Sequence, residues 1–218
     1  MNLYFISGLA VDKRVFQELT LSPNFSIYYI EWIQPLIRES IASYAKRLSA
    51  SIDQTKPFVL IGLSFGGMMA IEMNKFVHPV KTIIISSAAT VAELPWFIRA
   101  IRFMPIYRIT PPLFMKRPNQ IFFQLFGIKT KDEKELLKEI LKDTDSNILN
   151  WSIHAIINWR NDIIPPNFIH IHGNADNLLP IKFTKADIII EGGGHFMIYS
   201  KAREISLVLN DLLAQAQL

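Results

Sequence analysis

The chain has 218 residues, of which half are hydrophobic and 19% are charged, and its formal net charge is +4. Disordered chains have the opposite balance of charge and apolar content, and the length suits one α/β domain, so we expect a single domain over residues 1–218. The small positive excess falls short of the dense basic surface of a nucleic-acid-binding protein. The sequence contains no cysteine, which excludes disulfides, thiolate nucleophiles and zinc–thiolate sites.

No targeting or membrane segment is recognisable in the sequence. The N-terminal stretch MNLYFISGLAVDKRVF lacks the basic region and small-residue cleavage site of a signal peptide. The longest uncharged stretch, between Lys56 and Glu72, is short for a membrane span and contains glycine and serine. We therefore expect a cytoplasmic protein with no integral membrane segment and no nucleic-acid partner.

Short apolar runs alternate along the chain with segments of helical periodicity. The expected strands are residues 3–8, 26–33, 58–63, 81–88, 168–173 and 186–192, and the expected helices are 40–54, 65–77, 131–143 and 199–216. Continuously apolar runs are typical of parallel strands that are buried on both faces. The sequence therefore predicts a three-layer α/β/α sandwich around a mainly parallel six-stranded sheet, with ligands bound at the carboxyl ends of the strands.

The interval 90–160 interrupts this alternation. It contains no clear strand, is rich in phenylalanine and tryptophan, and is divided by prolines at positions 95, 105, 111, 112 and 118. Within it, residues 131–143 have a clear amphipathic pattern with exposed charges. We interpret the interval as a helical insertion that covers the ligand-binding end of the sheet as a lid.

The third predicted strand leads into Gly62-Leu63-Ser64-Phe65-Gly66, which matches G-x-S-x-G between a strand and a helix. This context is typical of a sharp turn that lifts a serine hydroxyl clear of the sheet. Side chains at positions 62 and 66 would collide with the folded-back chain, so glycine is needed there. The following helix directs its free N–H groups and the positive end of its dipole at the serine, which suits a developing oxyanion. An ordinary glycine-rich turn is the alternative.

A serine nucleophile needs a base, and His195 is the best placed histidine. It follows Glu191-Gly192-Gly193-Gly194 just after the last predicted strand, in a loop expected to be flexible enough to bring an imidazole over the edge of the sheet. An exposed loop histidine is the alternative. The other histidines are expected on the surface, in helix packing or in strand packing: His78, His154, and the pair His170 and His172.

Asp176 is the candidate that orients this base. It lies in His172-Gly173-Asn174-Ala175-Asp176, just past the fifth strand and therefore also at a carboxyl end. The alternatives are Asp12, Asp187 and Glu93; of these, Asp187 begins a strand, at the wrong end of the sheet. The chain order of serine, aspartate and histidine agrees with a known order of hydrolytic triads.

The segments ISGLAVDKRVF, GLSFGG, HGNAD and GGGHF together span nearly the whole chain, and on them the sequence resembles the α/β-hydrolase superfamily. The resemblance implies that Ser64 is the nucleophile, His195 the general base and Asp176 its partner. It also implies an acyl-enzyme mechanism without cofactor or metal. The expected backbone donors to the oxyanion are Leu9, in the loop after the first strand, and Phe65, directly after the nucleophile.

Two features depart from the pattern of the family. Ser7-Gly8 stands where the oxyanion loop commonly has His-Gly, which leaves backbone donation possible but changes what supports the loop. The chain also begins with the strand that precedes this loop, whereas larger members have two further N-terminal strands. We therefore expect a compact, wholly parallel sheet of six strands.

Residues 91–131 carry an excess of positive charge. They contain only one acidic residue, Glu93, against Arg99, Arg102, Arg108, Lys116, Arg117, Lys129 and Lys131. Basic side chains among aromatic ones could guide an acidic, partly apolar substrate, such as an acyl group on an acidic carrier protein, a CoA thioester or a lipid surface. An amphipathic lid with its arginines in water is the alternative. The expected substrate-binding residues are Trp96 and Phe123 in this insertion and Gly8 in the oxyanion loop.

Together these observations predict a soluble serine hydrolase that cleaves a small-molecule carboxylic ester or thioester. A methyl ester hydrolase of the biotin-pathway type, whose family uses a basic helical lid, is a more specific alternative. A catalytically silent hydrolase fold that binds a ligand or partner, and a lipase that acts at a membrane surface, are the others. Haloalkane and epoxide hydrolysis are disfavoured because a nucleophilic aspartate would be expected where Ser64 lies.

Overall fold

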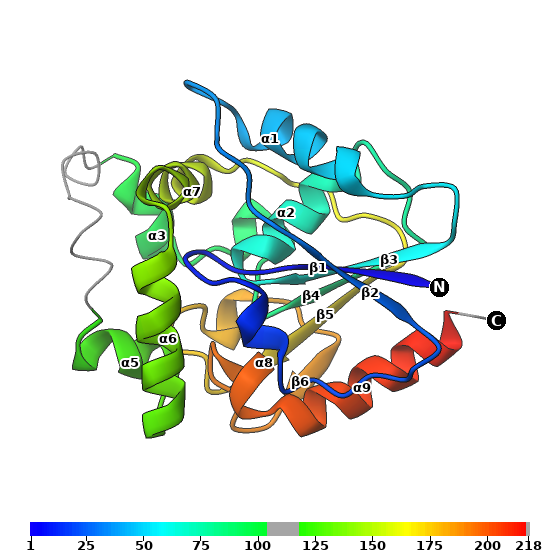
Figure 1. Cartoon of the computed structure of the whole chain (residues 1–218). Helices are drawn as coiled ribbons and strands as arrows, with labels where there is room; N and C mark the ends of the chain where they lie inside the picture. Colours follow the sequence, from blue (N-terminus) through cyan, green and yellow to red (C-terminus); the bar gives the residue numbers. More distant parts are fainter. Residues whose placement is uncertain (104–117, 217–218) are drawn as a thin grey trace.

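A six-stranded parallel sheet forms the centre of the computed structural model, which describes residues 1–103 and 118–216 (Figure 1). Its strands are β1 (Asn2–Ile6), β2 (Ser26–Ile30), β3 (Phe58–Leu63), β4 (Lys81–Ile85), β5 (Phe168–Gly173) and β6 (Ile188–Ile190). Their order is β2-β1-β3-β4-β5-β6, and each neighbouring pair is parallel. The predicted sheet is confirmed, although four of the strands end earlier than their apolar runs.

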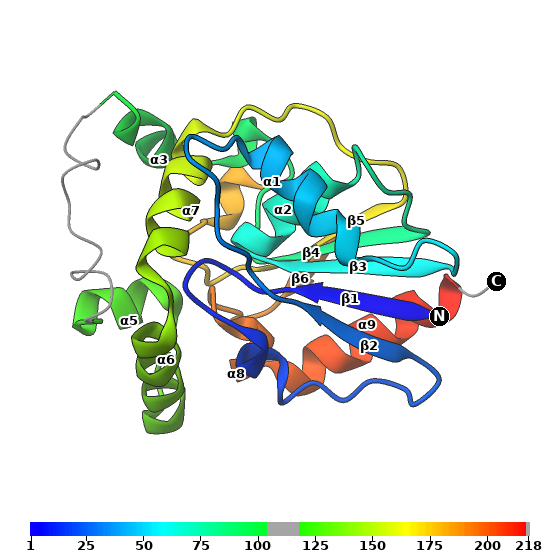
Figure 2. The same cartoon turned by 45° about the horizontal axis from the view of Figure 1, so that its top comes forward.

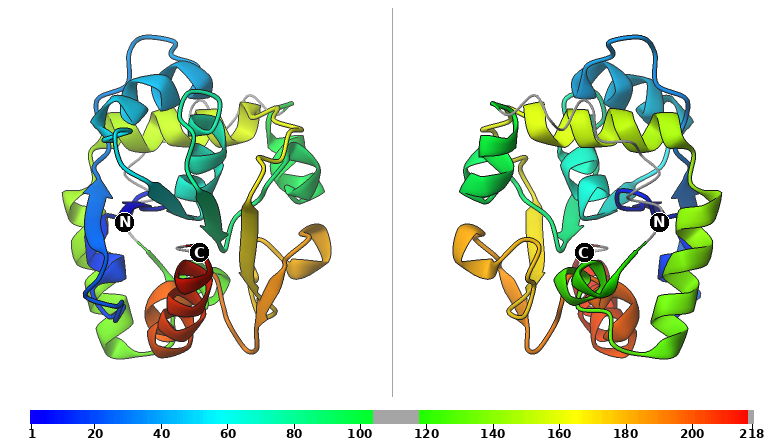
Figure 3. Two further views of the ribbon diagram at one scale, coloured as in Figure 1. Left: turned by 90° about the vertical axis from the view of Figure 1, so that its right-hand side faces the viewer. Right: turned by 90° about the vertical axis from the view of Figure 1, so that its left-hand side faces the viewer.

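Helices cover both faces of the sheet, as the prediction of three layers requires (Figures 1 and 3). One face packs against α1 (Ile41–Leu48) and α2 (Phe65–Met73), and the other against α8 (Met197–Ser200) and α9 (Ala202–Gln215). Because side chains alternate along a strand, Tyr4 and Ile6 join the first core while Leu3 and Phe5 join the second. Short 3-10 helices complete these layers: η1 (Lys13–Phe16), η2 (Ser49–Ser51), η3 (Val91–Glu93) and η5 (Ile181–Phe183).

Strand β2 departs from the expectation of burial on both faces. It lies at the edge of the sheet, and four of its five residues are exposed. Tyr28 is 46% exposed, although its ring stacks on Tyr4 with 5.1 Å between the centroids. An aromatic and β-branched run can therefore form an edge strand, because such rings can pack on neighbouring rings and still face water.

The interval between β4 and β5 folds into helices in its described parts, and these are α3 (Trp96–Ile101), α5 (Gln120–Phe126), α6 (Lys131–Asp143) and α7 (Ser146–Asn158). Figures 1 and 2 show them gathered at the end of the sheet where the strands point. Helix α6 has the predicted bounds because a capping box of Thr130 and Glu133 fixes its start. The prolines at positions 105, 111 and 112, which divide the predicted insertion, lie outside the described residues, as do the basic residues Arg108, Lys116 and Arg117.

No helix within residues 1–103 and 118–216 is both long enough and apolar enough to cross a membrane.

Candidate active site

Ser64 occupies the turn between β3 and α2, at the carboxyl end of a central strand. Its φ of 51° and ψ of −119° are costly for a residue with a side chain, and such strain is found mainly at functional turns. The predicted need for glycine is confirmed, because a Cβ at Gly62 would overlap the carbonyl of Gly66, and one at Gly66 would overlap the carbonyls of Ile6 and Ser7. The hydroxyl of Ser87 donates to the Ser64 carbonyl at 2.7 Å and ties the turn to the end of β4.

The structure brings the three predicted side chains together from distant parts of the chain. His195 Nε2 lies 2.9 Å from Ser64 Oγ, across 131 positions of sequence. On the other side of the ring, His195 Nδ1 lies 2.8 Å from Asp176 Oδ2. His195 and Asp176 are only 4% and 3% exposed. A serine hydroxyl, an imidazole and a carboxylate in this series can move a proton away from the serine as it attacks an electrophile.

Asp176 accepts hydrogen bonds on both carboxylate oxygens. Its Oδ1 accepts from the backbone N–H groups of Leu178 at 2.9 Å and Leu179 at 2.8 Å, and its Oδ2 faces His195. Burial alone would raise the pKa of Asp176, but His195 and the backbone N–H of Leu179 more than offset it and hold the pKa below its usual value. Asp176 is therefore an anion at neutral pH, which suits a group that stabilises a charged imidazole.

The loop that carries His195 is firmly packed, contrary to the predicted flexible loop. Ala175 N–H donates to the carbonyl of Gly193 at 3.0 Å, and a Cβ on Gly173 would overlap Gly193. On the lid side, a Cβ at Gly194 would come 3.1 Å from the Cα of Gly127 at the end of α5. The glycines thus serve close approach of three backbone segments, and this contact rather than mobility places the imidazole.

The loop after β1 packs directly against Ser64. A Cβ on Gly8 would lie 3.2 Å from the Cβ of Ser64. Ser7 supports the loop with its hydroxyl: Oγ donates to the Val11 carbonyl at 2.7 Å and accepts from Trp32 Nε1 at 3.0 Å. Ala10 follows with a φ of 58°, so the loop turns sharply just after Leu9.

The N–H of Phe65 is the first of helix α2 and has no partner within the helix. The Phe65 ring is buried and stacks on Trp32 with 5.3 Å between the centroids. Helix α2 therefore begins beside Ser64 with free N–H groups and the positive end of its dipole. These are the features that an oxyanion site needs.

The alternative acids are engaged elsewhere. Asp12 caps η1 and pairs with Arg14 at 2.7 Å, and Asp187 accepts from the backbone N–H of His170 at 2.7 Å. Glu93 is buried and accepts from the backbone N–H of Ala89 at 2.8 Å. His78 is exposed as predicted, and His154 lies exposed on α7 rather than in packing.

The predicted substrate-binding residues differ in their surroundings. Trp96 is 64% exposed on α3, whereas Phe123, on α5, is buried in the core. The ring of Phe126, one turn after Phe123, meets His195 edge-on at 5.3 Å between centroids. Sequence reasoning missed Phe126; the signal available was the repeat of phenylalanine along α5, which does not tell which ring faces the histidine.

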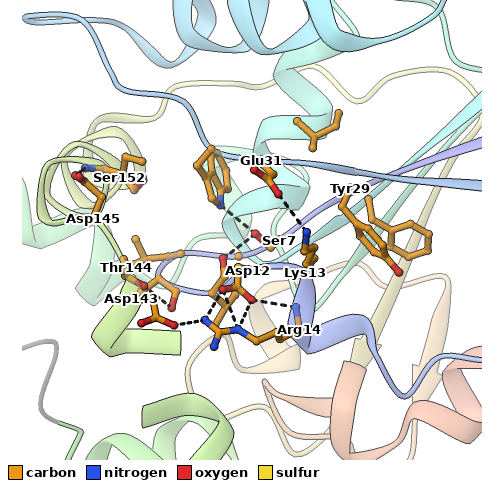
Figure 4. A pocket seen from close by; sticks show the side chains of 18 of the residues that line it. Ser7, Asp12, Lys13, Arg14, Tyr29, Glu31, Asp143, Thr144, Asp145 and Ser152 are labelled. Carbon is orange, nitrogen blue, oxygen red and sulfur yellow. Dashed lines mark hydrogen bonds and ion pairs between the residues drawn. The ribbon is translucent and has the colours of Figure 1, made fainter. Parts of the chain in front are cut away.

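A cavity of about 400 Å³ borders the loop that follows β1 (Figure 4). Its walls come from the loop after β1, the end of β2 and the junction of α6 and α7. Arg14 crosses its rim, and Nη2 bonds both Asp12 at 2.7 Å and Asp143 at 2.8 Å. This pair of contacts joins the segment after β1 to the helical insertion.

A parallel sheet with a strained serine between strand and helix, and a histidine and an aspartate at later strand ends, defines the α/β-hydrolase class. Residues 22–206 match the alpha/beta hydrolase family. The chain therefore belongs to this family, which confirms the resemblance inferred from its motifs, and it is a hydrolase of the α/β fold.

Solved structures agree with this fold at low sequence identity. An esterase from Exiguobacterium antarcticum is 15% identical with a TM-score of 0.75, and the match covers 100% of this chain and 92% of the esterase. A lipase-esterase related protein from Clostridium acetobutylicum is 16% identical with a TM-score of 0.72, covering 97% and 93%. A thermophilic esterase from Thermogutta terrifontis is 13% identical with a TM-score of 0.71, covering 99% and 90%. No curated protein matches the sequence.

Proposed function

We propose that the protein is a serine hydrolase of carboxylic esters or thioesters, with Ser64 as nucleophile, His195 as general base and Asp176 as its partner. The observation that carries this proposal is the continuous series of contacts Ser64 Oγ–His195 Nε2–His195 Nδ1–Asp176 Oδ2, at 2.9 and 2.8 Å. The esterase names among the similar structures also favour esters.

Acylation follows from these contacts. Ser64 Oγ attacks the acyl carbonyl carbon while His195 Nε2 takes the hydroxyl proton, and Asp176 stabilises the imidazolium that forms. The carbonyl oxygen becomes an oxyanion, for which Leu9 N–H and Phe65 N–H are the proposed donors. When the tetrahedral intermediate collapses, the bond to the leaving group breaks and His195 returns the proton to the departing alcohol or thiol.

Deacylation repeats these steps with water. His195 Nε2 removes a proton from a water molecule, whose oxygen attacks the acyl carbon of the Ser64 ester. The second intermediate collapses, the bond to Ser64 Oγ breaks, and the proton returns to that oxygen. The products are a carboxylic acid and the restored enzyme, so no oxidant, metal or cofactor is consumed.

For the substrate, we propose an acyl group held between the oxyanion loop and the helical insertion, with Gly8, Phe126 and Trp96 as candidate contacts. The excess of basic residues in 91–131 favours a substrate with a negative terminus or an acidic carrier. Phe123 is less suited to direct contact because it is buried in the core.

The test is hydrolysis of an ester and thioester panel, graded in acyl length and terminal charge, by the wild-type protein and Ser64→Ala. We expect turnover of at least one panel member and a loss of about 10⁴-fold or more in the Ser64→Ala protein. Ser43→Ala, at an exposed serine of α1, is the matched control and should keep full activity. Equal hydrolysis by wild type and Ser64→Ala would overturn the assignment of the nucleophile.

A further inference from the structure

Strand β5 places a pair of buried histidines behind the proposed active site. His170 and His172 are fully buried, and His170 Nε2 lies 3.0 Å from His172 Nδ1. His172 Nε2 lies 2.8 Å from the carbonyl oxygen of Leu179 and 3.5 Å from Asp176 Oδ2. The mechanism proposed above uses neither ring, yet the pair ends at the carboxylate that orients His195.

Both rings are neutral at neutral pH, and their contacts fix where each proton lies. Burial lowers the pKa of His170 to about 3 and also lowers the pKa of His172. A carbonyl oxygen only accepts, so the proton of His172 is on Nε2, which donates to Leu179. His172 Nδ1 is then an acceptor, and His170 Nε2 is the donor to it.

Leu179 connects His172 to the proposed acid in a second way. Its backbone N–H donates to Asp176 Oδ1 at 2.8 Å, while its carbonyl accepts from His172. His172 thus holds the turn that supplies N–H donors to one carboxylate oxygen. His172 Nε2 also lies 3.5 Å from Asp176 Oδ2, so the partial positive charge of its N–H group lies beside the oxygen that faces His195.

We propose that His172 is a positioning residue that fixes Asp176, and that His170 secures the donor tautomer of His172. This inference rests on the proposed function, because His172 can affect catalysis through Asp176 only if Asp176 orients His195. A carboxylate that can rotate or shift would leave the imidazole free to turn away from Ser64. Loss of the contacts that hold Asp176 would slow the chemical step and leave substrate binding nearly unchanged, since neither histidine reaches the substrate.

The experiment compares His172→Leu with His172→Gln, whose amide nitrogen can occupy the position of Nε2 and donate in its place. Turnover is measured per active site, counted by titration with a fluorophosphonate probe. We expect His172→Leu to lower kcat on the order of 10- to 100-fold with KM within about twofold, because a buried donor near a charge is lost. His172→Gln should recover most of kcat.

Leu209→Ala, at a buried position on α9, is the control for general destabilisation and should keep its kcat per titrated site. His170→Phe is the second variant if His172→Leu does not fold. It should lower kcat by about 3- to 10-fold, because it removes the donor to His172 Nδ1 that favours the Nε2–H tautomer of His172. Unchanged kcat in each of these histidine variants that folds would overturn the proposal, as would equal losses in His172→Leu and His172→Gln. Failure of the wild-type protein to react with the probe would instead overturn the proposed function.

Discussion

Ser64 combines an unusual backbone conformation, a position at the start of a helix and a contact with His195. Its positive φ stores strain, its position starts helix α2, and its hydroxyl lies within hydrogen-bond distance of His195. Each feature alone is compatible with an ordinary turn. Their combination is costly for folding and is the arrangement that the proposed nucleophilic attack would need.

Asp176→Asn should leave the fold intact and lower kcat by roughly 10³- to 10⁴-fold. An asparagine can still accept from the Leu178 and Leu179 N–H groups through its oxygen, but its amide nitrogen then faces His195 Nδ1. The imidazole would be held in the wrong tautomer and without a compensating negative charge. Steady-state kinetics checks this, with circular dichroism as the control for folding; a kcat within tenfold of wild type would contradict it.

His170 should make the protein less stable as pH falls. Burial lowers its pKa from the ordinary 6.5 to about 3, so in this window the unfolded chain binds a proton that the native state does not. The free energy of unfolding should therefore decrease from about pH 6.5 downwards, by up to about 1.4 kcal/mol per pH unit for one histidine. Urea unfolding between about pH 7.5 and about pH 4.5 measures this slope.

Two neighbours of His170 also affect how the free energy of unfolding changes with pH. His172 at 3.0 Å has a lowered pKa and adds to the slope, whereas burial raises the pKa of Glu93, 3.9 Å from His170 Nδ1, and opposes it. The difference between wild type and His170→Phe cancels whatever His172 and Glu93 contribute equally in both proteins, and leaves the slope that depends on His170. A slope that is the same in the two proteins would show that His170 is not held neutral.

At the scale of elements, the turns and loops that carry the site residues were predictable, whereas four strand ends and the contacts around the site were not. The β3–α2 turn, the start of α6 and the aspartate and histidine after β5 and β6 follow from local signals, namely spacing, capping and glycine. The edge position of β2 depends on which strands pair, and the approach of α5 to His195 depends on how the insertion docks. Such pairings join segments far apart in the chain, so no local pattern encodes them.

Helix α5 should contribute to substrate binding through Phe126. Its ring meets His195 edge-on, so Phe126→Ala would remove an apolar wall beside the reacting group. We expect KM for apolar esters to rise roughly tenfold, in line with the burial of one aromatic side chain. Leu125→Ala, at an exposed neighbouring position on the same helix, is the matched control and should leave KM unchanged. Equal effects of the two substitutions would contradict a specific role for Phe126.

At the scale of the whole molecule, the parallel strands bring Ser64, Asp176 and His195 to the carboxyl-end edge of the sheet. The basic interval 91–131 lies in the sequence between β4 and β5. If this charge steers substrate, kcat/KM for a carboxylate-terminated ester should fall several-fold as sodium chloride rises from about 0.01 M to about 0.3 M. A neutral ester of the same length should not respond. The double substitution Arg99→Gln and Arg102→Gln should reduce the response.

Arg203→Gln, at an exposed position on α9, is the control for a general loss of positive charge. It should preserve the salt response of the carboxylate-terminated ester. A response that is equal for charged and neutral esters would remove the case for an acidic substrate while leaving the proposed hydrolysis untouched.

Covalent labelling by a fluorophosphonate tests the central claim most directly, because such reagents need a serine activated by a neighbouring base. The wild-type protein should gain one adduct, mapped by peptide mass spectrometry to Ser64, and His195→Ala should slow the labelling by several orders of magnitude. A wild-type protein that gains no adduct, or gains it at another residue, would contradict the account.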